Sequence, residues 1–266
     1  MIVYRREIRS RFRSWWIWTL SLAAYSFAIL MLYPTFADEA AGMDAFISKL
    51  PKEFLRAFGL DRLSLSDILG YHATETYIIL ILASSLYAIL IGTSLLSREE
   101  SDRTIEFLLA RPVSRCRIVA EKLLASATLL LALNLVVSLV SWIGIELYRQ
   151  ADYPLGTLLW LSFAPFPAQL VFVHLGLLAT QLPGRRKASA ASGIGIVLVL
   201  YSVGFLAEMS DSLAFLRWLT PFSYAGAVDI VTSGLMRIRD LLVLVGANLL
   251  LVAGTFLLYR KKDVLL

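Results

Sequence analysis

The chain has 266 residues, of which 58% are hydrophobic and 17% are charged, and its formal net charge is +5. Soluble domains carry about 25% charged residues over a polar surface, whereas these charges gather in short tracts between apolar segments. The pattern excludes an ordinary soluble domain and indicates a membrane protein. Basic tracts beside apolar segments are typical of topology and of contact with membrane lipid, so nucleic acid is not expected as a partner.

Six stretches contain no Asp, Glu, Lys or Arg and have 19 or more residues each. A helix of about 20 residues crosses the hydrocarbon core, and only a helix satisfies its own backbone there. The sequence therefore predicts one all-α transmembrane domain with six spans, the fourth kinked at Pro165 and Pro167. The predicted spans are residues 15–33, 76–96, 123–145, 155–182, 188–207 and 241–259.

The distribution of Lys and Arg predicts the orientation. With a cytoplasmic N-terminus, the inner segments hold 17 basic residues and the outer segments hold 8. Because basic residues concentrate in cytoplasmic loops, both termini are expected in the cytoplasm. The first apolar run is longer than a signal-peptide core, so we interpret it as a retained anchor. The single cysteine, Cys116, falls in a predicted cytoplasmic loop and excludes an intrachain disulfide.

Three connecting segments show amphipathic patterns. Residues 1–14 mix apolar side chains with five arginines and predict a basic interfacial helix on the inner leaflet. The outer loop 34–75 predicts two short surface helices around Pro51. The outer segment 211–235 is too polar to span and predicts an interfacial or re-entrant helix pair broken at Pro221.

The cytoplasmic segment 97–122 is longer than a connector requires. Asp102 can cap a short helix that ends before Pro112, because the residue before proline disfavours helical backbone. The spacing of Ile105, Leu108 and Leu109 places them on one face of that helix. Two interpretations remain open at this point: a lever that docks on a cytosolic partner, or a helix lying on lipid headgroups.

The amino-acid sequence of this segment resembles that of the permeases of the second class of ABC exporters, which are related to bacitracin-resistance and sodium-efflux permeases. The resemblance rests on Glu99-Glu100, on Thr104 to Leu109 and on Arg111 to Arg115, with Lys122 behind. Arg103 departs from the family, which usually has glycine there. The resemblance implies that 97–122 is a coupling helix that docks into an ATP-binding subunit. The residues implied in this coupling are Glu99, Glu100, Thr104, Ile105, Glu106, Phe107, Leu108, Leu109, Arg111, Pro112 and Arg115.

The resemblance also implies partners and a cellular location for the chain. No Gly-x-x-x-x-Gly-Lys-Ser/Thr loop occurs, so the chain is expected to bind no cofactor and not to be an enzyme itself. ATP and Mg would be bound by a separate ABC ATPase subunit. A second permease copy, identical or a sister chain, would complete the transporter. The implied location is the plasma (inner) membrane of a bacterium or archaeon, and no metal-binding or substrate-binding residues are assigned.

Competing functions make different demands on the spans. A sensor or assembly factor would not need the elaborate segment 97–122. An intramembrane enzyme would need paired catalytic groups, and a secondary transporter would usually carry a carboxylate in mid-span. The polar residues within the predicted spans are uncharged or titratable, which leaves hydrogen bonding between helices as the simpler interpretation. These residues are Asn134, Gln169, His174 and Asn248.

Two further patterns give structural expectations. Trp15, Trp16 and Trp18 predict an aromatic belt at the membrane interface. Gly193 and Gly195, among small residues, predict a close helix contact on the fifth span.

Overall fold

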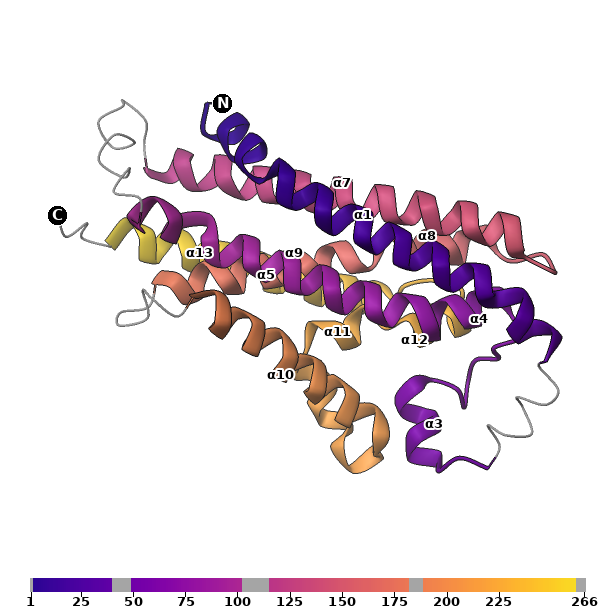
Figure 1. The fold of residues 1–266 in the computed structure, drawn as a ribbon. Helices are drawn as coiled ribbons and strands as arrows, with labels where there is room; N and C mark the ends of the chain where they lie inside the picture. The colour runs from indigo at the N-terminus through magenta and orange to yellow at the C-terminus, as the bar shows by residue number, and fades with distance from the viewer. Residues whose placement is uncertain (1, 40–48, 102–114, 182–188, 262–266) are drawn as a thin grey trace.

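The computed structural model describes residues 2–39, 49–101, 115–181 and 189–261, and within these ranges all regular structure is helical (Figure 1). Six helices are long and apolar enough to cross a membrane, which confirms the all-α fold with six spans. The elements are α1 Ile2–Asp38, α3 Lys52–Phe58, α4 Ile68–Tyr71, the π-helix η1 His72–Tyr77, α5 Ile78–Ser101, α7 Arg115–Tyr148, α8 Leu155–Phe163, α9 Pro165–Gln181, α10 Ser189–Met209, the 3₁₀-helix η2 Asp211–Leu219, α11 Pro221–Tyr224, α12 Ala227–Ser233 and α13 Ile238–Lys261.

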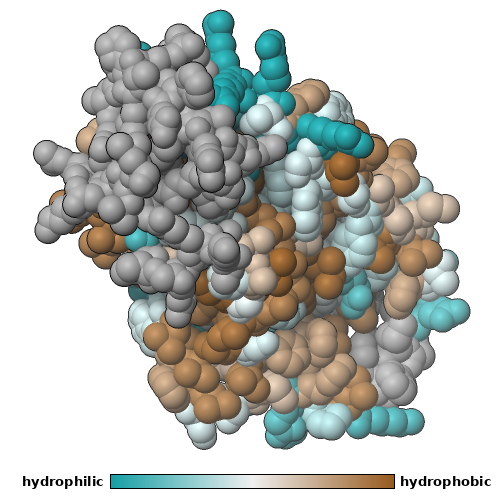
Figure 2. Space-filling view, turned by 60° about the vertical axis from the view of Figure 1, so that its left-hand side comes forward, coloured by the Kyte–Doolittle hydropathy of each residue, from teal (hydrophilic) through white to brown (hydrophobic). Residues whose placement is uncertain are grey.

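The two ends of the bundle differ in chemistry. At one end α1 begins, α5 ends, α7 begins and α13 ends (Figure 1). We call it the basic end, because Arg5, Arg6 and Arg9 of α1 are exposed there. Figure 2 is turned toward this end and shows hydrophilic side chains gathered at its top, with a largely hydrophobic surface below them. The short elements α3, η2 and α12 lie at the opposite end (Figure 1).

The structure corrects the expectation of a separate interfacial helix over residues 1–14. These residues, from Ile2 on, continue into the first span as a single helix, α1. The reason is that α1 packs along α7 from its first turns onward. Hydrogen bonds and ion pairs join residues 114 or 115 positions apart, at Glu7–Lys122, Trp15–Leu129 and Ser26–Ser141. This constant separation means that α1 and α7 run parallel over most of their length.

The second span starts earlier than its charge-free stretch. Its helical run begins at Ile68 and passes through η1 into α5, so His72 and Glu75 lie in the span rather than in an outer loop. Glu75 is exposed, and its charge therefore does not end the helix, whereas His72 is buried.

Of the expected surface helices, α3 begins directly after Pro51, and residues 40–48 lie outside the described ranges.

Prolines shape the later connections. The fourth span is interrupted at Ala164, directly before Pro165, in agreement with the predicted kink. The segment after α10 forms three short elements, η2, α11 and α12, rather than the expected helix pair. Pro221 occupies the first position of α11, where proline is tolerated because its missing N–H needs no partner.

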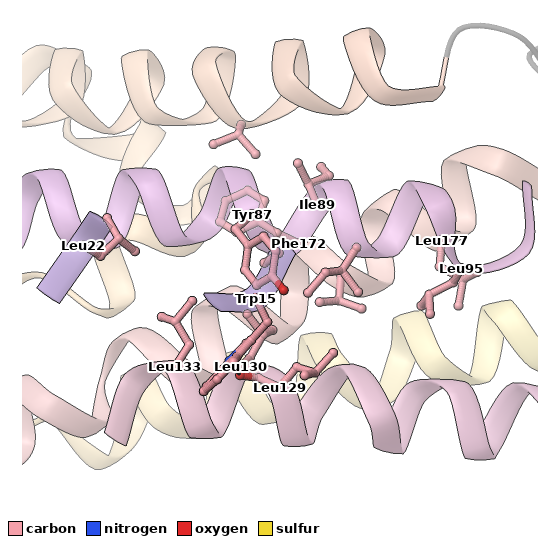
Figure 3. Packing of buried hydrophobic residues seen from close by; sticks show 14 of the residues in the cluster. Trp15, Leu22, Tyr87, Ile89, Leu95, Leu129, Leu130, Leu133, Phe172 and Leu177 are labelled. Atoms are coloured by element: carbon pink, nitrogen blue, oxygen red, sulfur yellow. Dashed lines mark hydrogen bonds between the residues drawn. The ribbon is translucent and has the colours of Figure 1, made fainter. Parts of the chain in front are cut away.

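The central core joins α1, α5, α7 and α9 around aromatic side chains (Figure 3). Trp15 is buried and its indole N–H donates to the Leu129 carbonyl oxygen at 2.8 Å. Trp18 stacks on Tyr87 with 5.5 Å between ring centroids. Trp16 is exposed, Trp18 is half-buried and Trp15 is buried, so the predicted aromatic belt is wrong for Trp15. On α1, the ring of Trp15 points toward α7 and the ring of Trp18 points toward α5.

Glycines allow α5 to approach its neighbours closely. A Cβ at Gly92 would overlap the carbonyl oxygen of Val173 on α9, and one at Gly193 of α10 would touch Thr93 of α5. The expected close contact of the fifth span is thus present at Gly193. Gly195, by contrast, faces open space.

Replacing Gly92 by Ala should destabilise the protein, because the new methyl group can be accommodated only by moving α5 away from α9. Overpacking of this kind costs about 1–3 kcal/mol. Gly246→Ala in α13, where a Cβ meets nothing within 4 Å, is the matched control and should cause no loss. Thermal unfolding of the purified protein in detergent measures both, and equal melting temperatures would contradict the close contact.

Candidate functional site

The predicted coupling residues fall on both sides of a gap in the described ranges. Glu99 and Glu100 lie in the last turn of α5, and Arg115 is the first residue of α7. Thr104, Ile105, Glu106, Phe107, Leu108, Leu109, Arg111 and Pro112 lie outside the described residues. The structure therefore describes the two helix ends that flank residues 102–114, which we call the base.

A buried ionic cluster joins three helices at this base, with Glu7 of α1 at its centre. One carboxylate oxygen of Glu7 accepts from Arg11 Nε at 2.6 Å, and the other lies 3.4 Å from Nζ of Lys122 on α7. The side chains of Glu7, Arg11 and Lys122 are 10%, 9% and 3% exposed. Arg11 also donates to the Ser94 hydroxyl at 2.7 Å, and Lys122 donates to the Leu95 carbonyl oxygen. The cluster thus ties α1 to the end of α5 and the beginning of α7.

A second carboxylate, Glu121 of α7, receives the first turn of α1. Its Oε2 accepts from the backbone N–H groups of Val3 and Tyr4 at 3.1 and 3.2 Å. Its Oε1 accepts from Arg117 at 3.1 Å. The first N–H groups of a helix have no partner within the helix and carry a partial positive charge, which an acidic side chain compensates. Glu121 therefore fixes the start of α1 on α7.

The energetic character of the cluster follows from its burial. Charges removed from water are stable only when opposite charges and hydrogen bonds compensate them, and loss of one partner typically costs about 3–5 kcal/mol. Glu7 compensates two cations at once, so neither Arg11 nor Lys122 can move far without it. This arrangement links α1, α5 and α7 mechanically beside the segment 102–114.

Neither the residue patterns nor the family resemblance predicts Glu7, Arg11 or Glu121 as site residues. Arg11 bears only on the predicted topology, together with the other basic residues of the tract. One local signal was available, since Glu7 is the single acid in a tract with five arginines and stands four residues before Arg11. Its partner Lys122 lies 115 residues away, which no local pattern reveals.

Neutral polar groups pair between helices farther along the bundle. The side-chain amide of Asn134 on α7 donates to Gln169 on α9 at 2.6 Å, and Gln169 donates to the Ser84 hydroxyl at 2.7 Å. On α9 and α13, His174 Nδ1 lies 2.8 Å from the Asn248 side-chain oxygen. The interpretation of these four residues as helix-to-helix hydrogen bonding is confirmed.

The geometry defines a multi-pass membrane protein with six helical spans and a charged joint beside residues 102–114, between the second and third spans. A family model described as ABC-2 family transporter protein matches residues 1–264, and the chain belongs to this family. Members are generally non-catalytic transmembrane permease subunits that work with an ABC ATPase. No curated protein matches the chain.

Replacing Glu7 by Gln should strongly destabilise the bundle, because it keeps the side-chain size but leaves Arg11 and Lys122 without their shared anion. The free energy of unfolding is expected to fall by about 3–5 kcal/mol. Glu146→Gln is the control, since its ion pair with Arg149 is 38% and 37% exposed and should contribute about 0–1 kcal/mol. Thermal unfolding of both variants in the same detergent measures the difference, and equal shifts would contradict the cluster's role.

Proposed function

We propose that the chain is the permease subunit of an ABC exporter in the plasma membrane of a bacterium or archaeon, coupled through residues 97–122 to a separate ATPase. Family membership supports the permease role. The observation that carries the coupling proposal is the ionic cluster, which ties α1 to both helices that flank the segment. A plain connector would need no such joint.

The proposed mechanism is alternating access driven from the basic end. Two ATPase subunits, each holding ATP and Mg, close on nucleotide binding and move the coupling segments of two permease chains. Ile105, Phe107, Leu108 and Leu109 supply the apolar docking face. The transporter is completed by a second copy or by a sister permease, and the substrate path lies between the two chains.

The ionic cluster determines which helices move together with residues 97–122. Because Lys122 reaches Leu95 and Glu7, a displacement of α7 is passed to α5 and α1 rather than absorbed at the joint. Charged side chains set the register of docking, with Glu99, Glu100, Glu106, Arg111 and Arg115 available beside the apolar face.

The arrangement of charges supports export over a carboxylate-coupled secondary transporter. Within the described helices, the side chains that meet in the middle of the bundle are amides, a hydroxyl and a histidine, and they pair with one another. Of the carboxylates buried among the described residues, Glu7 and Glu121 lie near the basic end, where they already neutralise cations and a helix terminus. The third, Asp240, lies in the first turn of α13 and pairs with Arg239.

Replacing Leu108 and Leu109 together by Asp should abolish association with the ATPase, because two charges enter the proposed docking face. Co-purification of an ABC ATPase from native membranes, identified by mass spectrometry, measures the association. Leu235→Asp is the control: Leu235 is 50% exposed between α12 and α13, at the opposite end of the bundle. Retention of the ATPase by the double variant would overturn the docking face.

A further inference from the structure

A pocket of about 330 Å³ opens at the end of the bundle opposite the basic end. Its walls come from α5 and α10 of the bundle and from the short elements α3, η2 and α12. Of these short elements, α3 and η2 pack against α10, whereas α12 packs against η1. Its volume falls in the range of about 300–1,000 Å³ that small-molecule sites occupy. The pocket has two chemically different zones.

The floor of the pocket is apolar and largely aromatic. Tyr77 and Ile81 line it from the second span, and Tyr201, Phe205 and Phe222 line it from α10 and α11. The rings support one another: Tyr201 meets Phe222 edge to face at 5.5 Å. The hydroxyl of Tyr77 donates to the Ala225 carbonyl oxygen at 2.7 Å, which holds its ring in place. Such a floor favours an apolar body.

The rim of the pocket consists of ion pairs that cross between elements. Arg56 of α3 meets Asp211 of η2 at 3.1 Å, and Arg217 of η2 meets Glu208 of α10 at 2.6 Å. Arg62 meets Asp229 of α12 at 2.8 Å.

These rim pairs are partly open to water. In the Arg217–Glu208 pair the side chains are 45% and 37% exposed. Exposed ion pairs contribute only about 0–1 kcal/mol, so their members are free to exchange partners. The rim can therefore open one pair for a ligand at little cost.

We propose that this pocket binds an amphiphile with a compact zwitterionic head and an apolar body. The body covers the aromatic floor, and the head inserts into a rim pair such as Arg217–Glu208. A zwitterion replaces one ion pair by two, because its anion meets the arginine and its cation meets the carboxylate. A purely cationic head would leave the displaced arginine without a partner, and a purely anionic head would do the same to the carboxylate.

The inference goes beyond the proposed permease function and does not rest on it. Binding needs neither ATP nor a partner subunit, so the pocket and the coupling mechanism can fail independently of each other. Two sources share this ligand chemistry: a phospholipid of the surrounding bilayer, and an amphiphile arriving from water.

The test uses the full chain in nanodiscs made of phosphatidylglycerol, so that the bilayer offers no zwitterionic head. Titration with octylphosphocholine, followed by isothermal calorimetry against empty nanodiscs, is expected to show one saturable site. Octyltrimethylammonium, octyl sulfate and octyl glucoside, which share the chain but not the head, should bind at least 10-fold more weakly. Equal affinity for all four heads, or no saturable site, would overturn the proposal.

Variants locate the site within the pocket. Glu208→Gln removes one rim charge and Phe205→Ala opens the floor, and each should weaken octylphosphocholine binding at least 10-fold. Arg217→Gln breaks the same rim pair from its other side and should have the same effect. If one of these two variants fails to fold, the other still tests the pair. Glu146→Gln breaks a comparable exposed pair outside the pocket and should bind like the unchanged chain. Unchanged affinity in all three pocket variants would overturn the assignment.

A further titration separates the two sources. Adding diacyl phosphatidylcholine to the nanodiscs should displace octylphosphocholine if bilayer lipid enters the pocket, and displacement would identify the lipid as the source. Undiminished binding would identify a water-borne amphiphile.

Discussion

The structure depends on one buried carboxylate, Glu7, which holds Arg11 and Lys122 against each other where three helices meet. Without it, Arg11 and Lys122 would lose the anion that they share in a poorly hydrated site, and the joint between α1, α5 and α7 would be weakened. Glu121 adds to the same joint by receiving the first N–H groups of α1. The bundle is thus fixed by charge at its basic end, while an amide pair joins α7 to α9 and a histidine–asparagine pair joins α9 to α13 farther along.

This separation of charged and uncharged contacts fits the proposed mechanism, in which the ATPase moves the bundle from its basic end. In the proposed mechanism, the charged joint beside residues 102–114 would transmit displacement, whereas amides and hydroxyls inside the bundle hold helices together without placing a charge in lipid. The opposite end is built differently, from short elements joined by exposed ion pairs around an aromatic floor. Such pairs exchange readily, so this end can adapt to a ligand while the basic end stays rigid.

The six spans could be predicted because lipid excludes charged side chains. The absence of charge from a stretch of about 20 residues is visible in that stretch alone and needs no knowledge of its neighbours in the fold. Features that depend on which way a side chain faces could not be predicted. The charge of Glu75 predicts a loop, but its exposed position lets the helix pass through it. The tryptophan pattern predicts Trp15 at the interface, but its side chain is buried in the core. The ionic joint was missed because Glu7 meets Lys122 across 115 residues. The docking residues from Thr104 to Pro112 lie outside the described ranges and stay a prediction.

Distance measurements by pulsed electron paramagnetic resonance test the rigid joint most directly. Cys116 is exposed at the start of α7 and takes one spin label, and the second goes on exposed Arg13→Cys of α1 or Leu257→Cys of α13. On adding ATP to the complex with its ATPase, the distance from α7 to α1 should stay constant while the distance from α7 to α13 changes. A change between α7 and α1 as large as that between α7 and α13 would contradict the account.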